Sequence, residues 1–202
     1  MGCCKVCFEQ IKKQGLNSFI NEGNICQKCY NNFDVIFHKQ IIDGIEVLSL
    51  YEYNDFLKNI LFQFKGCFDI ELKKVFLERH LLELKIKFRN YIIVPIPSTI
   101  ESDEEREFNH VCEIFSSLDL PIFHCLKKKF DFKQSNLSKK EREKVKQKLF
   151  VTDGEKLKDK KVLIVDDVLT TGSSIKASIE LLKKYKPKKM KGLVVAEKCR
   201  NM

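Results

Sequence analysis

The chain has 202 residues, of which 44% are hydrophobic and 32% charged, enough for one compact core with a small appendage. No apolar run is long enough to cross a bilayer and no secretory signal is visible, so we expect a cytoplasmic protein that is not an integral membrane protein. The net charge is +9, and residues 127–148 hold ten basic and three acidic side chains, while residues 183–200 hold eight and one. Such segregation is typical of surfaces that bind phosphates or nucleic acid, although solvated lysine faces of helices produce it as well.

Two pairs of cysteines lie near the N-terminus, Cys4-x-x-Cys7 and Cys26-x-x-Cys29, with eighteen residues between them. This spacing is typical of a structural zinc site, because four thiolates fill a tetrahedral shell and leave no open position. A redox dithiol and an iron–sulfur cluster are the alternatives. Cys3 adjoins Cys4, so either could be the first ligand, and Cys4 gives the tighter spacing. A segment this short cannot build its own core, so we expect bound Zn²⁺ to supply its folding energy.

Helical and strand patterns alternate along the rest of the chain. We expect helices over residues 31–42, 55–64, 69–88, 109–118, 138–149 and 174–185. We expect strands over residues 45–53, 91–96, 161–165 and 191–197, the first of them as a strand or a hairpin. This alternation predicts an α/β fold with a parallel sheet flanked by helices. We therefore divide the chain into a zinc-binding module over residues 1–42 and an α/β domain over residues 43–202.

The most informative stretch is VLIVDDVLTTGSS, residues 162–174. Four apolar residues predict a buried strand with Asp166 and Asp167 at its carboxyl end, the edge at which open α/β sheets bind ligands. The following loop comprises Thr170, Thr171, Gly172, Ser173 and Ser174, and a helix is expected to begin at about residue 175. Backbone N–H groups at a helix N-terminus bind phosphate, and a glycine lets the backbone approach it closely. Because carboxylates repel phosphate, we expect the two aspartates to face a sugar diol or a metal ion.

Two other interpretations of this stretch are available. One is a buried strand followed by an ordinary capped helix that binds nothing. The other is the Walker B strand of a nucleotide hydrolase, which also ends in acidic residues. That class requires a G-x-x-x-x-G-K-[ST] loop elsewhere, and the sequence has none.

The stretch resembles the phosphoribosyl-pyrophosphate (PRPP) motif of the type I phosphoribosyltransferases. Together with the cysteine pairs, it makes the chain similar to the ComF family, and the similarity covers most of the length. The further matching positions are Tyr53, Phe64-Lys65, Asp69-x-Glu71-Leu72, Val94-Pro95-Ile96-Pro97, Arg106-x-Phe108-Asn109, Gln134, Leu137, Arg142 and Phe150. The departures from the family pattern are Glu107, His110 and Val145, and the acidic side chains between residues 101 and 105.

The resemblance implies a phosphoribosyltransferase-like domain over residues 43–202 and a role for each part of the site. Asp166 and Asp167 would hold the ribose hydroxyls, and residues 170–174 would bind the 5′-phosphate. Pyrophosphate, with Mg²⁺, would lie at the loop formed by Pro95, Ile96, Pro97 and Ser98. Residues 127–142 would close as a lid, in which Lys133 and Arg142 neutralise the leaving group. Asp166, Asp167 and Arg142 are therefore the expected catalytic residues, if the chain is an enzyme of the glycosyltransferase class.

The family resemblance also implies a cellular role. It predicts a PRPP-binding factor that supports natural transformation by moving incoming single-stranded DNA into the cytoplasm. The expected partners are PRPP or a related ribose phosphate, single-stranded DNA through the basic segments, and competence-machinery proteins at the inner face of the membrane, where the chain would be peripheral. The alternative is a salvage phosphoribosyltransferase that transfers ribose 5-phosphate from PRPP to a nucleobase-like acceptor. A third hypothesis is an adaptor that keeps the motif but binds no ribose phosphate.

Overall fold

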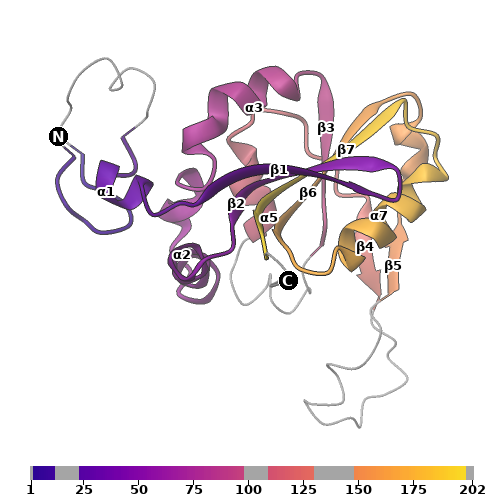
Figure 1. Ribbon diagram of the computed structural model, residues 1–202. Helices are drawn as coiled ribbons and strands as arrows, with labels where there is room; N and C mark the ends of the chain where they lie inside the picture. Colours follow the sequence, from indigo (N-terminus) through magenta and orange to yellow (C-terminus); the bar gives the residue numbers. More distant parts are fainter. Residues whose placement is uncertain (1, 12–22, 98–108, 130–147, 199–202) are drawn as a thin grey trace, which may run out of the picture.

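A computed structural model describes residues 2–11, 23–97, 109–129 and 148–198. Its main sheet has five strands in the order β1-β2-β7-β6-β3 (Figure 1). The strands are β1 (Val35–Ile42), β2 (Ile45–Glu52), β7 (Lys189–Glu197), β6 (Lys161–Leu169) and β3 (Tyr91–Pro95). Every pair is parallel except β1 with β2. A separate antiparallel pair joins β4 (Leu126–Lys129) to β5 (Lys148–Val151). The expected mostly parallel α/β sheet is confirmed.

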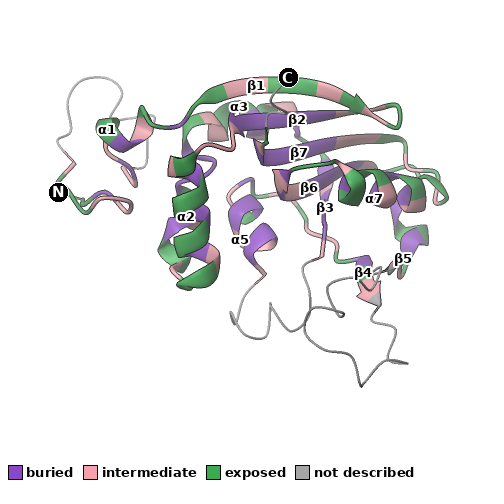
Figure 2. Ribbon diagram, turned by 60° about the horizontal axis from the view of Figure 1, so that its bottom comes forward, coloured by how far each residue is buried: buried purple, intermediate pink, exposed green. Residues whose placement is uncertain are grey.

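The sheet is covered on both faces, because alternate residues of a strand point to opposite sides. Along β6, Leu163 and Val165 belong to one buried cluster, which includes residues of α2, α3 and α5. Val162 and Ile164 belong to a second cluster, which includes the buried face of α7. These helices are α2 (Asp55–Gly66), α3 (Leu81–Lys87), α5 (His110–Ser116) and α7 (Ser173–Lys183). In Figure 2 the inner strands β2, β7 and β6 are largely buried, while the edge strand β1 is not.

The helix expected over residues 31–42 is wrong, since residues 35–42 form the edge strand β1. Asp43 and Gly44 connect β1 to β2 as a two-residue hairpin turn, with φ of 47° and 76°. Positive φ at both positions is typical of a type I′ turn, for which Asp-Gly is a preferred sequence. The turn signal was present in the sequence, but the mixed polarity of the preceding residues favoured a helix.

The single helix expected over residues 69–88 is also wrong. The segment instead forms the 3₁₀ helices η2 (Ile70–Lys74) and η3 (Glu78–His80), followed by α3. Val75, Phe76 and Leu77 are all buried, and three consecutive residues would cover most of the circumference of a straight helix. A break in the helix lets all three enter the core.

Two further expectations concern the ends of elements. Residues 138–147 of the helix expected over 138–149 lie outside the described residues, and residues 148 and 149 begin strand β5 rather than ending a helix. The motif strand, expected over 161–165, continues to Leu169, so that both aspartates lie within it.

The N-terminal segment packs directly on the helical layer. Lys5 Nζ lies 2.7 Å from Glu71 Oε2 on η2. The backbone N–H groups of Gly23 and Asn24 donate to Glu78 Oε1 on η3, at 3.1 and 3.3 Å. Cys4 and Cys29 belong to the same buried cluster as the sheet and α2. The last eight residues of the expected 1–42 module are strand β1 of the main sheet.

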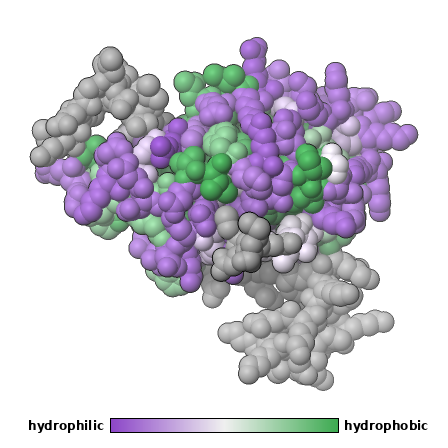
Figure 3. Space-filling view, in the orientation of Figure 1, coloured by the Kyte–Doolittle hydropathy of each residue, from purple (hydrophilic) through white to green (hydrophobic). Residues whose placement is uncertain are grey.

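On the face seen in Figure 3, exposed hydrophobic side chains of the described residues form separate patches among hydrophilic ones. Leu82 and Ile86 of α3 are exposed to 65% and 70%. Scattered exposure of this kind is normal for a folded protein. No helix in the described part of the chain has the length and apolar character needed to span a membrane.

Candidate functional site

The candidate site lies at one edge of the sheet, where the parallel strands end. Pro95, the last residue of β3, pairs with Val165 of β6, and Leu169 at the end of β6 pairs with Glu197 of β7. The Ile96 N–H donates to the Val165 carbonyl at 2.9 Å. The sheet thus brings residues 95–97 beside Asp166 and Asp167, as the sequence predicted. Ser98 of the same loop and Arg142 lie outside the described residues, as do Lys133 and Arg106.

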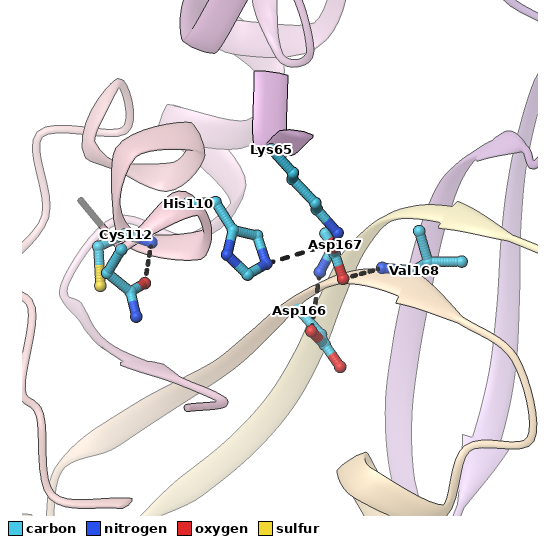
Figure 4. A network of polar contacts seen from close by, with 7 residues as sticks. Lys65, His110, Cys112, Asp166, Asp167 and Val168 are labelled. Carbon is cyan, nitrogen blue, oxygen red and sulfur yellow. Dashed lines mark hydrogen bonds and ion pairs between the residues drawn. The ribbon is translucent and has the colours of Figure 1, made fainter. Parts of the chain in front are cut away.

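The two aspartates point to opposite faces of the sheet. Asp167 lies on the α2 and α5 side, where it is 7% exposed. Its Oδ2 forms an ion pair with Lys65 Nζ from α2 and lies 3.4 Å from His110 Nε2 of α5 (Figure 4). Its Oδ1 accepts the Val168 N–H at 2.7 Å. A lysine cation therefore already faces the Asp167 carboxylate within the protein.

Asp166 has a different environment. Its side chain is half-buried and points away from Lys65 and His110 in Figure 4, and its Oδ1 accepts the Asp167 N–H at 3.0 Å. Burial raises the pKa of Asp166 to about 7, against the opposing effect of the Lys65 and Lys128 cations. At neutral pH this carboxyl can therefore either accept or donate a hydrogen bond, whereas its neighbour is held by a cation.

The contacts of Lys65 and His110 with Asp167 were missed by the sequence, which offered Lys65 as either a phosphate contact or a surface residue and assigned His110 no role. Lys65 stands at the end of α2, and His110 is the first residue of α5, directly after its N-cap Asn109. Asn109 Oδ1 accepts the Cys112 N–H at 2.9 Å, which fixes the start of the helix that presents His110. The available signals were the Phe64-Lys65 match and the departure at His110, but neither indicated a contact with Asp167.

The loop after β6 has the geometry of an anion site. Gly172 has φ of 75° and is the N-cap of α7, which begins at Ser173, within one or two residues of the expected start. Gly172 has no side chain to cap the helix, and the Ser173 N–H donates to Thr171 Oγ1 at 3.4 Å. Thr171 Oγ1 lies 2.8 Å from Ser173 Oγ, which places two hydroxyls at the same end of the helix. Such an end favours phosphate through its N–H groups and its dipole.

A second candidate centre is formed by Cys4, Cys7, Cys26 and Cys29. Their sulfurs all lie within 4.8 Å of one another. Four donors at about 2.3 Å from a tetrahedral Zn²⁺ would be about 3.8 Å apart, so only a slight contraction is needed. Cys26 Sγ accepts the Cys29 N–H, as expected for a short knuckle. Cys3 is exposed and lies outside this group, which favours Cys4 as the first ligand. The four thiols could hold a metal ion with no position left open.

Comparisons with known proteins agree with these observations. A protein-family model described as "Phosphoribosyl transferase domain" matches residues 110–201. "Competence protein ComFC" of Bacillus subtilis (strain 168) is 28% identical over 85% of this chain and 74% of its own length. "Competence protein ComFC" of Streptococcus pneumoniae (strain ATCC BAA-255 / R6) is 26% identical over 93% of this chain and 83% of its own length.

A solved structure, a purine phosphoribosyltransferase from Pyrococcus horikoshii Ot3, is 20% identical over 62% of this chain and 82% of its own length, with a TM-score of 0.38. A score this low adds nothing to the fold assignment, which rests on the observed sheet and on the domain match. The similarity to the two relatives covers most of the chain. This chain is therefore similar to ComFC competence proteins over most of its length, with a phosphoribosyltransferase-like domain behind an N-terminal four-cysteine cluster.

Proposed function

We propose that the chain binds PRPP or a related ribose phosphate at the carboxyl edge of its sheet and acts in natural transformation. The observation that carries the proposal is the end of β6, where Asp166 is followed after a short loop by the glycine-capped N-terminus of α7. Residues 170–174 would surround the 5′-phosphate. Pro95, Ile96 and Pro97, and Ser98 beyond them, would approach the pyrophosphate from β3.

In this proposal the two aspartates have unequal roles. Asp166, half-buried and facing away from Lys65, contacts the ribose hydroxyls. Asp167 acts through Lys65 and His110 as a positioning residue, because it ties α2 and α5 to the strand that carries Asp166. If transfer occurs, positive charge develops on the ribose ring as pyrophosphate leaves, and the Asp166 carboxylate stabilises it electrostatically. Arg142 and Lys133 remain proposed contacts of the leaving group.

Two metal ions belong to this proposal. Zn²⁺ would be held by Cys4, Cys7, Cys26 and Cys29, in the structural role that a closed set of four thiolates favours. Mg²⁺ would accompany PRPP, and when bound it neutralises pyrophosphate charge. Asp166 is half-buried on the strand that leads into the proposed phosphate loop and could contribute an oxygen ligand.

The proposed cellular role rests on the relatives, both of which are named competence proteins. We infer that the chain handles incoming single-stranded DNA on the cytoplasmic side, beside competence proteins of the inner membrane. The basic segments support contact with a polyanion, since several of their lysines lie in β4 and in the first residues of β7. The proposed division into residues 1–42 and 43–202 assigns metal binding to the first part and ribose-phosphate binding to the second.

The ligand is tested by calorimetric titration of the zinc-loaded chain with PRPP and Mg²⁺. We expect wild-type binding that is lost in Asp166→Asn and kept in the control Asp153→Asn, whose exposed carboxylate lies 3.4 Å from Lys156 Nζ at the start of η5. Equal binding by all three proteins would reject the proposed ribose contact. Release of pyrophosphate that depends on an added nucleobase would instead favour the salvage transferase.

The cellular role is tested separately, in the organism that encodes the chain. A strain carrying Asp166→Asn should take up DNA into its outer compartment normally but give at least about tenfold fewer transformants. The strain with Asp153→Asn should transform as the parent does. Normal transformation by the Asp166→Asn strain would count against a role for the ribose-phosphate site in this process.

A further inference from the structure

A cluster of three polar side chains lies at the carboxyl end of β7. Glu197 Oε2 lies 2.9 Å from His38 Nδ1, and Glu197 Oε1 accepts a hydrogen bond from Gln40 Nε2 at 2.8 Å. His38 and Gln40 belong to the edge strand β1, far from Glu197 in the sequence. The Glu197 side chain is only 17% exposed. Both oxygens of one largely buried carboxylate therefore fix two side chains of β1.

This cluster borders the residues that would hold the 5′-phosphate. Leu169, which immediately precedes the proposed phosphate loop, is the register partner of Glu197 on the neighbouring strand, so their Cα atoms are about 5 Å apart. Ile42 follows Gln40 by two residues on β1 and lies on the same face of the sheet. Its Cδ1 would lie 3.2 Å from a Cβ atom placed on Gly172. The strand that carries the cluster thus reaches the loop itself.

The cluster also lies on the same face of the sheet as Asp166. Register partners in the consecutive strands β1, β2, β7 and β6 are His38, Ser49, Val194 and Asp166. Register partners share a face, and Val194 belongs to the buried cluster of α7. The carboxylate that would contact the ribose and the two side chains held by Glu197 are therefore on one side of the sheet.

Each of these two side chains keeps one hydrogen-bonding group for which the described residues supply no partner. His38 is 54% exposed and presents Nε2, and Gln40 presents its amide oxygen. A ring nitrogen and an amide oxygen suit the N–H and C=O groups on the edge of a nucleobase. The Glu197 carboxylate between them disfavours a second anionic group. The cluster therefore suits the neutral part of a nucleotide better than another phosphate.

The chemistry of the ribose ring gives the direction in which a base would extend. Pyrophosphate in PRPP and the base in a nucleotide are attached to opposite faces of the ring at the anomeric carbon. In the proposed function pyrophosphate lies beside β3, which flanks β6 on one side, whereas β7 flanks it on the other. A base on the same ribose would therefore extend toward Glu197 and away from the pyrophosphate loop.

We propose that His38 and Gln40, held by Glu197, form a base subsite, and that the chain binds a nucleoside 5′-monophosphate there. The 5′-phosphate occupies residues 170–174, the ribose hydroxyls contact Asp166, and the edge of the base forms hydrogen bonds with Gln40 and His38. Glu197 does not touch the ligand and is a positioning residue. The inference rests on the proposed function and names a second ligand of the same site.

The experiment is calorimetric titration of the zinc-loaded full chain with the 5′-monophosphates of adenosine, guanosine, cytidine and uridine, and with ribose 5-phosphate as the ligand without a base. We expect at least one nucleotide to bind about tenfold more tightly than ribose 5-phosphate, as two added hydrogen bonds would give. His38→Ala and Gln40→Ala should each remove most of this preference and leave the affinity for ribose 5-phosphate within about twofold of wild type.

The matched control is Lys39→Ala, which removes an exposed side chain between the two. Lys39 is the register partner of Leu48, which belongs to the cluster on the other face of the sheet, so this variant should keep the preference. Glu197→Ala should reduce the preference without changing the affinity for ribose 5-phosphate or the melting temperature. Glu197→Gln should recover part of it, because its remaining oxygen still accepts a hydrogen bond.

Three outcomes would reject different parts of the inference. Equal affinity of wild type for the nucleotides and for ribose 5-phosphate would overturn the base subsite and leave the ribose-phosphate site in place. A preference that survives in both His38→Ala and Gln40→Ala would overturn the assignment of these residues. No binding of ribose 5-phosphate or PRPP by wild type would reject the proposed function itself.

Discussion

The four-cysteine cluster and the aspartate pair are both made of residues that stand close together in the sequence, but the fold treats them in opposite ways. The cysteines come from two short knuckles and converge, so that all four sulfurs lie within 4.8 Å of one another. Asp166 and Asp167 are adjacent, yet they diverge to opposite faces of β6. A short loop can turn several side chains toward one point, whereas the two-residue period of a strand forces neighbours apart.

The cysteine cluster and the aspartate pair therefore depend on different parts of the chain. The cysteine cluster takes its four sulfurs from its own two knuckles, and its segment packs on η2 and η3 through Lys5 and the N–H groups of Gly23 and Asn24. The aspartate pair takes its environment from α2, α5 and β4, which contribute Lys65, His110 and Lys128. Substitutions in the cysteine cluster should therefore have a large local effect. Substitutions at the aspartate pair should have different effects at Asp166 and at Asp167.

The largest expected effect is the loss of metal from the cysteine cluster. Cys29→Ser should reduce the zinc content from one ion per chain to none, because apparent binding free energies of structural zinc are about 10–16 kcal/mol and depend on all four ligands. The measurement is zinc content by mass spectrometry, together with the rate of proteolysis before residue 33. Cys3→Ser is the control and should keep the metal, since Cys3 lies outside the cluster. Loss of zinc from Cys3→Ser alone would contradict the assignment of Cys4.

The second effect concerns the cation that faces Asp167. Lys65→Met should lower the free energy of unfolding by about 3 kcal/mol, because it leaves a buried carboxylate without its counter-charge. Urea unfolding checks this value, and Lys65→Met combined with Asp167→Asn should recover most of the loss. Lys85→Met is the matched control. It breaks the pair with Asp119, whose side chain is 77% exposed, and should cost no more than about 1 kcal/mol. Equal losses in both single variants would contradict the special position of Asp167.

The third effect distinguishes Asp166 from its neighbour through pH. Because the folded chain raises the pKa of Asp166 from 3.8 to about 7, it binds a proton that the unfolded chain has released between these values. This contribution to stability is present below about pH 4 and is lost as the pH rises toward 7. Asp166→Asn should remove this loss and be about 2 kcal/mol more stable than wild type at pH 8. A pKa shift of one unit corresponds to about 1.4 kcal/mol, and the expected value is smaller than the full shift because the Asp166 side chain is only half-buried. The unfolding free energy of both proteins at pH 5 and pH 8 measures the difference.

The smallest effect tests the loop that follows the aspartates. Gly172→Ala should lower the free energy of unfolding by about 1–2 kcal/mol, because φ is 75° and the new Cβ would lie 3.2 Å from Ile42 Cδ1. Gly44→Ala has nearly the same φ, 76°, with no atom within 4 Å of the new Cβ. The loss of unfolding free energy in Gly44→Ala should therefore reflect backbone strain alone. Only Gly172→Ala should also weaken PRPP binding. A weaker PRPP affinity in Gly44→Ala would reject the proposed role of the α7 N-terminus.

The parts that the sequence predicted correctly are those that local chemistry controls. The strand at β6, the glycine before α7 and each of the two cysteine pairs depend on residues within a few positions of one another. The edge strand β1 was missed because its mixed polarity resembles a helix face and its identity depends on pairing with β2. The contacts of Lys65 and His110 with Asp167 could not be predicted, because they arise only when α2 and α5 pack on the same face of the sheet.

The Glu78 carboxylate couples the unfolding of the cysteine cluster to that of the helices that cover the sheet. It is 7% exposed and takes N–H hydrogen bonds from Gly23 and Asn24, which immediately precede the second cysteine pair. If those residues lose their conformation, a buried charge in the layer between η2 and α3 loses two donors at once. The cost of an empty metal site is then transmitted to the helices that cover the sheet. Zinc supply would therefore set the melting temperature of the whole chain, and the cluster and the ribose-phosphate domain would unfold as one unit.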